Sequence, residues 1–272
     1  MTSKNDKTNR NTFDVVAPYY DELMSHVNYP GWVRETRHVA ACLCRERLRV
    51  LDLACGTATF AVSLARETGW QVVGLDSSIE MVRCGRTKAE GHDPLQLIVG
   101  EMQHPALRDG FDLVVSLFDS VNFLLTDDQL RDTFREVNRM LTPDGLFFFD
   151  AITEKNVQRN FEGEPWVEPL RNTTCKWSST YDTDRRMVYT TLDIRDVATV
   201  TVVERLYSDV EIRDALADAE LDIVAVMEAH TWDEPTSATE RIEYIACRGD
   251  GEPYRRKFPN ISERYKATLP VR

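Results

Sequence analysis

The sequence contains no long apolar run. Its apolar stretches are far shorter than the roughly 20 residues that a membrane-spanning helix needs. The first ten residues, 1–10, are polar and contain no apolar segment of the kind found in a signal peptide. These absences predict a soluble, cytoplasmic protein with no membrane partner.

Paired cysteines are also missing. The chain has six cysteines, but they form no C-x-x-C pair and no zinc-ligand spacing. We therefore expect free thiols in a reducing compartment. Because no cluster of metal-ligating residues is visible in the sequence, we also expect no metal site. The cysteines are Cys42, Cys44, Cys55, Cys84, Cys175 and Cys247.

The sequence also has no excess of positive charge. The formal net charge is −12 at pH 7, and the sequence pI is about 5.0. Because a protein that binds nucleic acid needs a basic surface, this balance argues against nucleic acid as the main partner. With 42% hydrophobic and 29% charged residues, the composition is that of a globular protein. A small molecule is the expected partner.

The most informative stretch that is present covers residues 50–60. A short apolar run ending near Asp52 is followed by small residues around Gly56, and apolar residues then recur at helical spacing. This pattern predicts a strand, a tight turn and a helix whose N-terminus faces a ligand. The full G-x-G-x-x-G phosphate motif is absent, because Ala58 stands where a second glycine would be. A carboxylate at Asp52 suits a cation, such as an ammonium group, better than a pyrophosphate.

Acidic residues also follow the next three predicted strands. Asp76 ends the run 70–75, Glu101 follows the run 95–99, and Asp119 follows the run 111–117. In an open parallel sheet the carboxyl ends of the strands line one crevice. A carboxylate that ends the second strand, about 20 residues after the glycine turn, is placed to accept hydrogen bonds from both hydroxyls of a ribose.

These stretches resemble a known family. The sequences DLACGT (52–57), GLDSS (74–78), GEM (100–102) and FDLVV (111–115) are similar to the first four motifs of class I S-adenosylmethionine-dependent methyltransferases. The resemblance implies an α/β fold with a Rossmann-like seven-stranded sheet. It also implies S-adenosylmethionine as cofactor and a small-molecule methyl acceptor. Ala58 departs from the family pattern, but alanine should still make the turn.

Carried over residue by residue, the resemblance assigns cofactor contacts. Asp52 would orient the turn and the ammonium group, Asp76 would bind the ribose hydroxyls, and Glu101 would accept from the adenine amino group. The full set of expected cofactor-binding residues is Trp32, Asp52, Ala54, Cys55, Gly56, Asp76, Ser77, Met81, Glu101, Met102, Phe118 and Asp119.

The residue pattern in the rest of the sequence predicts the domain organisation. We expect a flexible tail over 1–11, a methyltransferase domain with N-terminal cover helices over 12–151 and 206–248, and a C-terminal tail over 249–272. Residues 152–205 are predicted to form an inserted antiparallel β lobe of about three strands, because threonine and valine alternate with other residues there. In the resembling family such a lobe covers the substrate or forms a dimer contact, so a homodimer is consistent with it.

The candidate catalytic residues are Tyr20, Asn122 and His230. Tyr20 matches an aromatic position of the family's cover, Asn122 follows the fourth strand, and His230 follows the sixth. A hydroxyl acceptor would need a general base, whereas a neutral amine would not. Both N- and O-methylation therefore remain open, and for His230 a structural or surface role is favoured over that of a base.

Two other functions remain open at this level. A nicotinamide-dependent oxidoreductase would share the strand–turn–helix pattern, although the missing glycines and the position of Asp52 speak against it. A protein that binds the cofactor without catalysis would keep all four motifs.

Overall fold

The computed structural model describes residues 12–91, 95–161 and 163–270, so the predicted tail over 1–11 lies outside the described residues. The main sheet has seven strands in the order β10-β11-β5-β4-β1-β2-β3. β11 pairs antiparallel with both β5 and β10, and the other neighbouring strands are parallel. This confirms the predicted α/β fold with a Rossmann-like seven-stranded sheet. The strands are β1 (Arg49–Leu53), β2 (Gln71–Asp76), β3 (Leu95–Val99), β4 (Phe111–Ser116), β5 (Leu141–Ile152), β10 (Leu221–Glu228) and β11 (Arg241–Arg248).

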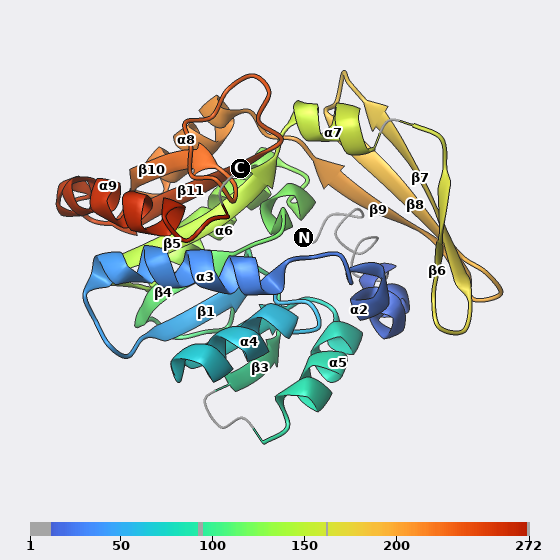
Figure 1. Ribbon diagram of the computed structural model, residues 1–272, viewed down its shortest axis with the longest axis horizontal. Coiled ribbons are helices and arrows are strands. Elements are labelled where there is room, and N and C mark those ends of the chain that lie inside the picture. Colours follow the sequence, from blue (N-terminus) through green and yellow to red (C-terminus); the bar gives the residue numbers. More distant parts are fainter. Residues whose placement is uncertain (1–11, 92–94, 162, 271–272) are drawn as a thin grey trace.

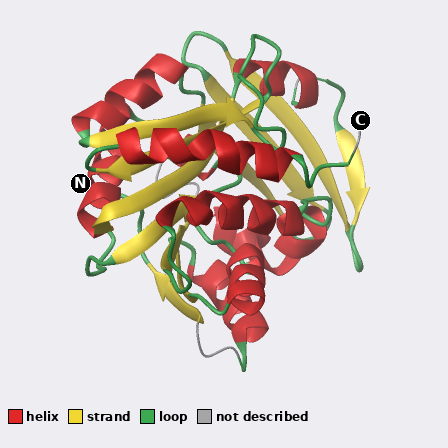
Figure 2. Cartoon of the chain, turned by 60° about the vertical axis from the view of Figure 1, so that its left-hand side comes forward, coloured by secondary structure: helices red, strands yellow, loops and turns green. Residues whose placement is uncertain are grey.

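Helices cover both faces of this sheet (Figures 1 and 2). One face packs against α3 (Tyr29–Ala40), α4 (Thr59–Thr68) and α9 (Glu252–Lys266). The other packs against α6 (Asp127–Met140) and α8 (Asp209–Asp218). Because both faces are covered, the strands are apolar almost without interruption. The remaining helices are α2 (Tyr20–Leu23), α5 (Ile79–Ala89), α7 (Glu154–Asn160), η1 (Ala17–Tyr19), η2 (Ala41–Leu43) and η3 (Ser120–Phe123).

Local sequence signals explain where several helices begin. Thr126 and Ser208 each cap a helix with a reciprocal capping box, to Gln129 in α6 and to Glu211 in α8. Such caps satisfy backbone donors that the helix itself leaves unpaired, and each contributes about 1 kcal/mol. The cover helix α3 starts at Tyr29, because Asn28 caps it by accepting from the Gly31 N–H.

The inserted lobe is a separate four-stranded antiparallel sheet in the order β6-β7-β8-β9. It contains one strand more than we predicted, the short β6. One face buries Leu192 and Val202 against Val16 and Leu23 of the N-terminal segment. In Figure 1 this sheet stands at the right of the main sheet, beside α2. The strands are β6 (Trp166–Pro169), β7 (Thr174–Asp182), β8 (Met187–Ile194) and β9 (Ala198–Arg205).

The prediction of a solvated C-terminal tail is wrong. Residues 252–266 form α9, and Tyr254, Ile261 and Tyr265 are buried against the main sheet's core. These three side chains fall on one face of a helix, so their burial stabilises the segment in spite of its many charges. Within the described part of the chain, none of the helices has the length and apolar character of a membrane span.

Candidate cofactor pocket

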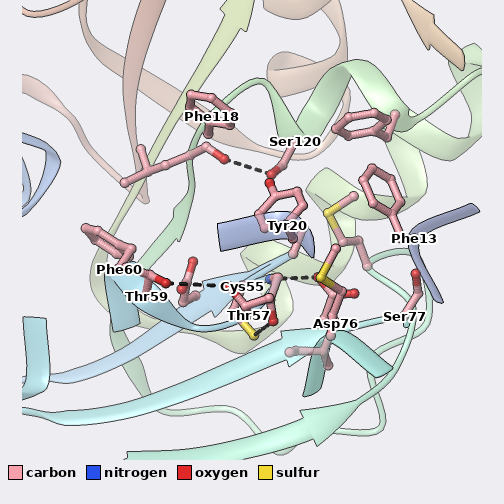
Figure 3. Close-up of a pocket in the computed structure, with 18 of the residues that line it drawn as sticks. Phe13, Tyr20, Cys55, Thr57, Thr59, Phe60, Asp76, Ser77, Phe118 and Ser120 are labelled. Carbon is pink, nitrogen blue, oxygen red and sulfur yellow. Dashed lines mark hydrogen bonds between the residues drawn. The ribbon is translucent and has the colours of Figure 1, made fainter. Parts of the chain in front are cut away.

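A pocket opens at the carboxyl ends of β1, β2 and β4 (Figure 3). Its wall contains eleven of the twelve residues that we expected to bind the cofactor, together with Tyr20; Asp119 is the exception. The strand-end pattern therefore located the pocket. Its lining residues are Phe13, Tyr20, Tyr29, Trp32, Asp52, Ala54, Cys55, Gly56, Thr57, Thr59, Phe60, Leu75, Asp76, Ser77, Met81, Gly100, Glu101, Met102, Gln103, Leu117, Phe118, Ser120, Phe123 and Leu124.

The turn after β1 is built from left-handed residues. Ala54, Gly56 and Ala58 have φ values of 61°, 53° and 60°. Ala58 therefore makes the turn that the family usually assigns to glycine, at a cost of about 1–2 kcal/mol. A Cβ on Gly56 would lie 3.7 Å from the ring of Tyr20, so this ring packs directly over the turn.

Asp76 orders the turn. Its carboxylate accepts from the Gly56 N–H at 2.8 Å and from the Ser78 N–H at 2.9 Å. Burial raises the pKa of Asp76 to about 6, although these two hydrogen bonds act in the opposite direction. The Asp76 carbonyl also accepts from the Gly100 N–H, which leads the chain into the loop carrying Glu101 and Met102.

Asp52 is the second buried carboxylate of the pocket. It is only 3% exposed, and its Oδ2 has no hydrogen-bond partner. Burial raises the pKa of Asp52 well above its ordinary value, and the neighbouring charge of Asp76 raises it further. An acceptor atom left unpaired in a pocket wall is a place where a ligand donor would be stabilised.

The N-terminal cover is fastened across the pocket by two aspartates. Asp21 accepts from the hydroxyls of Thr57 and Thr59 and from Lys88 Nζ. Asp14 accepts from the hydroxyl of Ser78, which caps α5. We did not predict either aspartate as a site residue, because their partners lie 36 to 67 positions away in the sequence.

The turn after β4 is strained and tightly held. Phe118 and Asp119 are consecutive left-handed residues, with φ values of 61° and 54°. The Asp119 N–H donates to Asp150 Oδ2 at 2.8 Å, and Arg241 donates to both carboxylates and lies 5.2 Å from the Phe118 ring centre. Strain of this kind, of order 1–3 kcal/mol per residue, persists only where surrounding contacts impose it.

Glu204 of β9 joins this cluster from the inserted lobe. It is 4% exposed, shares a hydrogen bond with the carboxyl group of Asp119, and leaves its Oε1 without a partner. Burial raises the pKa of Glu204 well above its ordinary value, and the charge of Asp119 raises it further. The inserted lobe is thus linked to the turn that presents Phe118 to the pocket.

Two predicted catalytic residues lie outside the pocket wall. Asn122 is fully buried, donates to the Arg205 carbonyl and accepts from the Ile152 N–H. Its amide therefore ties β5 to β9 and does not face a ligand. His230 contacts Glu35 at 2.9 Å and packs edge-on to Trp32 from outside the pocket. Only Tyr20 of the three lines the pocket.

The wall also contains residues that we did not predict, among them Phe13, Thr57 and Phe123. Asp150 and Arg241 support the wall without lining it. For Asp150 a signal was present, because it follows the apolar run 146–149 in the same way that Asp119 follows its strand.

Fold and pocket together define an α/β protein that binds its ligand at the carboxyl ends of parallel strands. Comparison with known proteins identifies the class. A family model described as "Methyltransferase domain" matches residues 50–145. The chain is 30% identical over 238 residues to the "Putative methyltransferase YqeM" of Bacillus subtilis (strain 168), covering 85% of this chain and 94% of that one.

Solved structures agree in fold. A S-adenosylmethionine-dependent methyltransferase from Clostridium acetobutylicum ATCC 824 has a TM-score of 0.73 and 22% identity, covering 86% of this chain and 98% of that one. CalS10, an amino pentose methyltransferase from Micromonospora echinaspora solved with S-adenosylmethionine, has a TM-score of 0.65 and 20% identity over 85% and 96% of the two chains.

The chain belongs to the class I S-adenosylmethionine-dependent methyltransferase family, and S-adenosylmethionine is its cofactor. The nicotinamide alternative is thereby set aside.

Proposed function

We propose that this protein transfers a methyl group from S-adenosylmethionine to an amine of a small, largely apolar molecule. When bound, the cofactor supplies an electrophilic methyl group on a positively charged sulfur. The chain's own residues bind it, orient the acceptor and keep water out. Orientation of this kind can supply about 7–11 kcal/mol of the barrier reduction.

The pocket fits the cofactor at one end. The unpaired Oδ2 of Asp52 is suited to the ammonium group of the methionine part, since a cation would compensate a buried carboxylate. Asp76 lies beside the same turn and is suited to the ribose hydroxyls, and Glu101 and Met102 follow β3 as the resemblance requires for adenine.

The acceptor is expected at the opposite end, where the cover and the turn after β4 meet. We call this surface the acceptor wall; it comprises Phe13, Tyr20, Phe118, Ser120 and Phe123. Phe13, Tyr20 and Phe123 also pack against the inserted sheet, which closes this end from the outside. Three phenylalanine rings and one tyrosine ring favour an apolar or aromatic acceptor.

One observation supports an amine over a hydroxyl: the acceptor wall contains no group that would take a proton at neutral pH. Burial raises the pKa of Tyr20 well above its ordinary value, so its phenol stays protonated and does not act as a base. Ser120 donates its hydroxyl to the Leu117 carbonyl. A neutral amine carries its own lone pair and needs no base, whereas a hydroxyl does.

The test is a matched pair of acceptors. Purified protein would be incubated with S-adenosylmethionine and either 2-phenylethylamine or 2-phenylethanol, and S-adenosylhomocysteine and methylated products would be measured by mass spectrometry. Methylation of the amine at a rate at least ten times that of the alcohol supports the proposal. Preferential methylation of the alcohol would overturn it.

The alternative of a cofactor-binding protein without catalysis makes a different prediction. Calorimetry would then show S-adenosylmethionine binding, while a wide panel of amines, alcohols, phenols and aminosugars would yield no S-adenosylhomocysteine above the rate without acceptor. Turnover of any member of the panel excludes this alternative.

A further inference from the structure

A second cluster of ionisable side chains lies outside the cofactor pocket. Glu35 of α3, Glu243 of β11 and His230 of the turn after β10 bring their ligand atoms within 4.8 Å of one another. α3 and α9 lie side by side above this part of the sheet (Figure 1). The cluster could not be predicted from the sequence, because Glu35 and His230 are 195 positions apart.

Both carboxylates are completely buried. Glu35 and Glu243 are each 0% exposed, and one oxygen of each, Glu35 Oε2 and Glu243 Oε1, has no hydrogen-bond partner. Among the described residues, neither carboxylate forms an ion pair with a lysine or arginine, and the basic group beside them is His230, whose Nδ1 lies 2.9 Å from Glu35 Oε1. A protonated His230 would compensate one carboxylate only, and burying the second without a counter-charge is costly, so a further cation or proton must compensate it.

The other two carboxylate oxygens are held in place. Glu35 Oε1 accepts from the Tyr265 hydroxyl at 2.5 Å, and Glu243 Oε2 accepts from the indole N–H of Trp232 at 2.8 Å. Such outer donors orient carboxylates that bind a metal and leave their remaining oxygens directed at it. The two unpaired oxygens are therefore available as ligands, and the imidazole of His230 lies beside them with its Nδ1 2.9 Å from Glu35 Oε1.

A single proton would neutralise one of the carboxylates, whereas a divalent ion would neutralise both and use both unpaired oxygens. One imidazole nitrogen and two carboxylate oxygens form a ligand set suited to Zn²⁺ or Mn²⁺, with ligand distances of about 2.0–2.2 Å. The His230 side chain is 50% exposed, which provides a path for the ion and room for coordinated water.

We propose that Glu35, His230 and Glu243 form a binding site for a divalent transition-metal ion. The site joins the cover helix α3 to β11 next to Trp32, whose ring contacts His230 and also lines the cofactor pocket. Its role is to fasten α3 and to position Trp32. It lies apart from the acceptor wall, and it does not depend on the identity of the methyl acceptor.

The experiment uses the full-length protein treated with EDTA and desalted. ZnCl₂ and MnCl₂ would be titrated separately by calorimetry into the wild type, Glu243→Gln and His230→Asn. His104→Asn is the matched control, because His104 is an exposed histidine on the loop after β3, away from the cluster. Thermal unfolding with and without metal would be recorded for each protein.

We expect one ion per chain in the wild type and in His104→Asn. Binding should weaken about 100-fold or more in Glu243→Gln and His230→Asn, because each loses a direct ligand. The metal should raise the unfolding temperature of the wild type but not that of these two variants. Glu243→Gln without metal should unfold at a higher temperature than metal-free wild type, which also establishes that it folds.

Two results would overturn the proposal. One is the absence of stoichiometric binding of either ion to the wild type, which would leave a shared proton as the compensation. The other is equal binding by the wild type and His230→Asn, since His230 is half exposed and its substitution should leave the fold intact. Neither result bears on methyl transfer, which is measured separately with the acceptor panel.

Discussion

The Asp21 carboxylate accepts a hydrogen bond from the Thr57 hydroxyl at 2.6 Å, and this contact joins the cover to the turn after β1. The same carboxylate also accepts from Thr59 and from Lys88 Nζ, the latter at 2.6 Å. Two helices and one turn are thus held together by a single side chain at the edge of the pocket. Because the cover supplies Tyr20 to the pocket wall, this junction should determine how well the cofactor is enclosed.

Asp21→Ala should therefore weaken binding of S-adenosylhomocysteine about tenfold. The substitution removes hydrogen bonds that contribute about 1 kcal/mol each, part of which the open cover recovers by hydration. Asp21→Asn keeps an oxygen for Thr57 but loses the charge that attracts Lys88, so its affinity for S-adenosylhomocysteine should decrease less than that of Asp21→Ala. Calorimetric titration measures the affinity of both variants. The control is Asp218→Asn, which breaks a surface ion pair with Arg131; equal affinities in all four proteins would contradict the role of this junction.

The second prediction concerns pH. Burial raises the pKa of Asp76 to about 6 in the protein without ligand. If the ionised carboxylate accepts the ribose hydroxyls, as proposed, affinity for S-adenosylhomocysteine should depend on the protonation of Asp76. Below pH 6 it should fall by up to tenfold per pH unit, because binding must then displace a proton.

Asp76→Asn provides the comparison. Its amide cannot ionise, so its affinity should be weaker than that of the wild type at pH 7.5 and should fall less steeply than that of the wild type below pH 6. Calorimetric titration of the wild type and Asp76→Asn with S-adenosylhomocysteine between pH 5 and 8 measures this difference. A wild-type affinity that does not change down to pH 5 would show that Asp76 does not act as an ionised acceptor.

Local patterns in the sequence predicted the first strands of the main sheet and three acidic residues of the pocket wall. Strand ends are visible locally, because an apolar run stops at a polar residue, and Asp52, Asp76 and Glu101 were found in this way. Parallel topology then places these ends together without further information. The seven-stranded sheet and the other expected pocket residues came from the family resemblance.

What could not be predicted depends on pairing between distant segments. Asn122 has the polarity of a ligand-binding residue, but its partners are the backbone of Arg205 and Ile152, which only the folded chain brings near. In the C-terminal segment the count of charges obscured the spacing of Tyr254, Ile261 and Tyr265 on one helix face. Pro259 within that segment also disfavours a helix on local grounds, and burial of the three side chains overrides it.

The third prediction concerns the carboxyl group of Glu204, which is buried beside Asp119. Because burial raises the pKa of Glu204 in the native state, the native state binds more protons than the unfolded state above the ordinary glutamate pKa of about 4.3. The stabilisation is fully present below that value and is lost as the pH rises through the native pKa. This group should therefore make the free energy of unfolding of the wild type decrease as the pH rises above about 4.3.

Glu204→Gln should remove this decrease. Glutamine keeps a donor toward Asp119 and cannot ionise, so the variant should become more stable relative to the wild type as the pH is raised from 6 to 9. Urea unfolding at four pH values measures the difference, with Glu168→Gln of the short β6 as a control in the same lobe. Parallel pH dependence of Glu204→Gln and the wild type would show that Glu204 does not carry the proton.

The last prediction concerns Arg241, the single cation in a group of four buried or half-buried side chains with Asp119, Asp150 and Glu204. Arg241 donates to Asp119 at 2.8 Å and also to Asp150, which is 0% exposed. Arg241→Met keeps much of the packing on the Phe118 ring but leaves the carboxylates without a counter-charge. Removing one partner of a buried ion pair typically costs about 3–5 kcal/mol, so urea unfolding should show a decrease of that order in the free energy of unfolding.

The control for this prediction is an exposed arginine. Arg185→Met removes an arginine whose side chain is 76% exposed, and it should change the free energy of unfolding by less than about 0.5 kcal/mol. Because the strained Phe118–Asp119 turn would lose its support, affinity for S-adenosylhomocysteine should also fall in Arg241→Met but not in Arg185→Met. If both variants were equally stable, the cluster would be held by contacts other than this arginine, and the geometry of Phe118 would need another explanation.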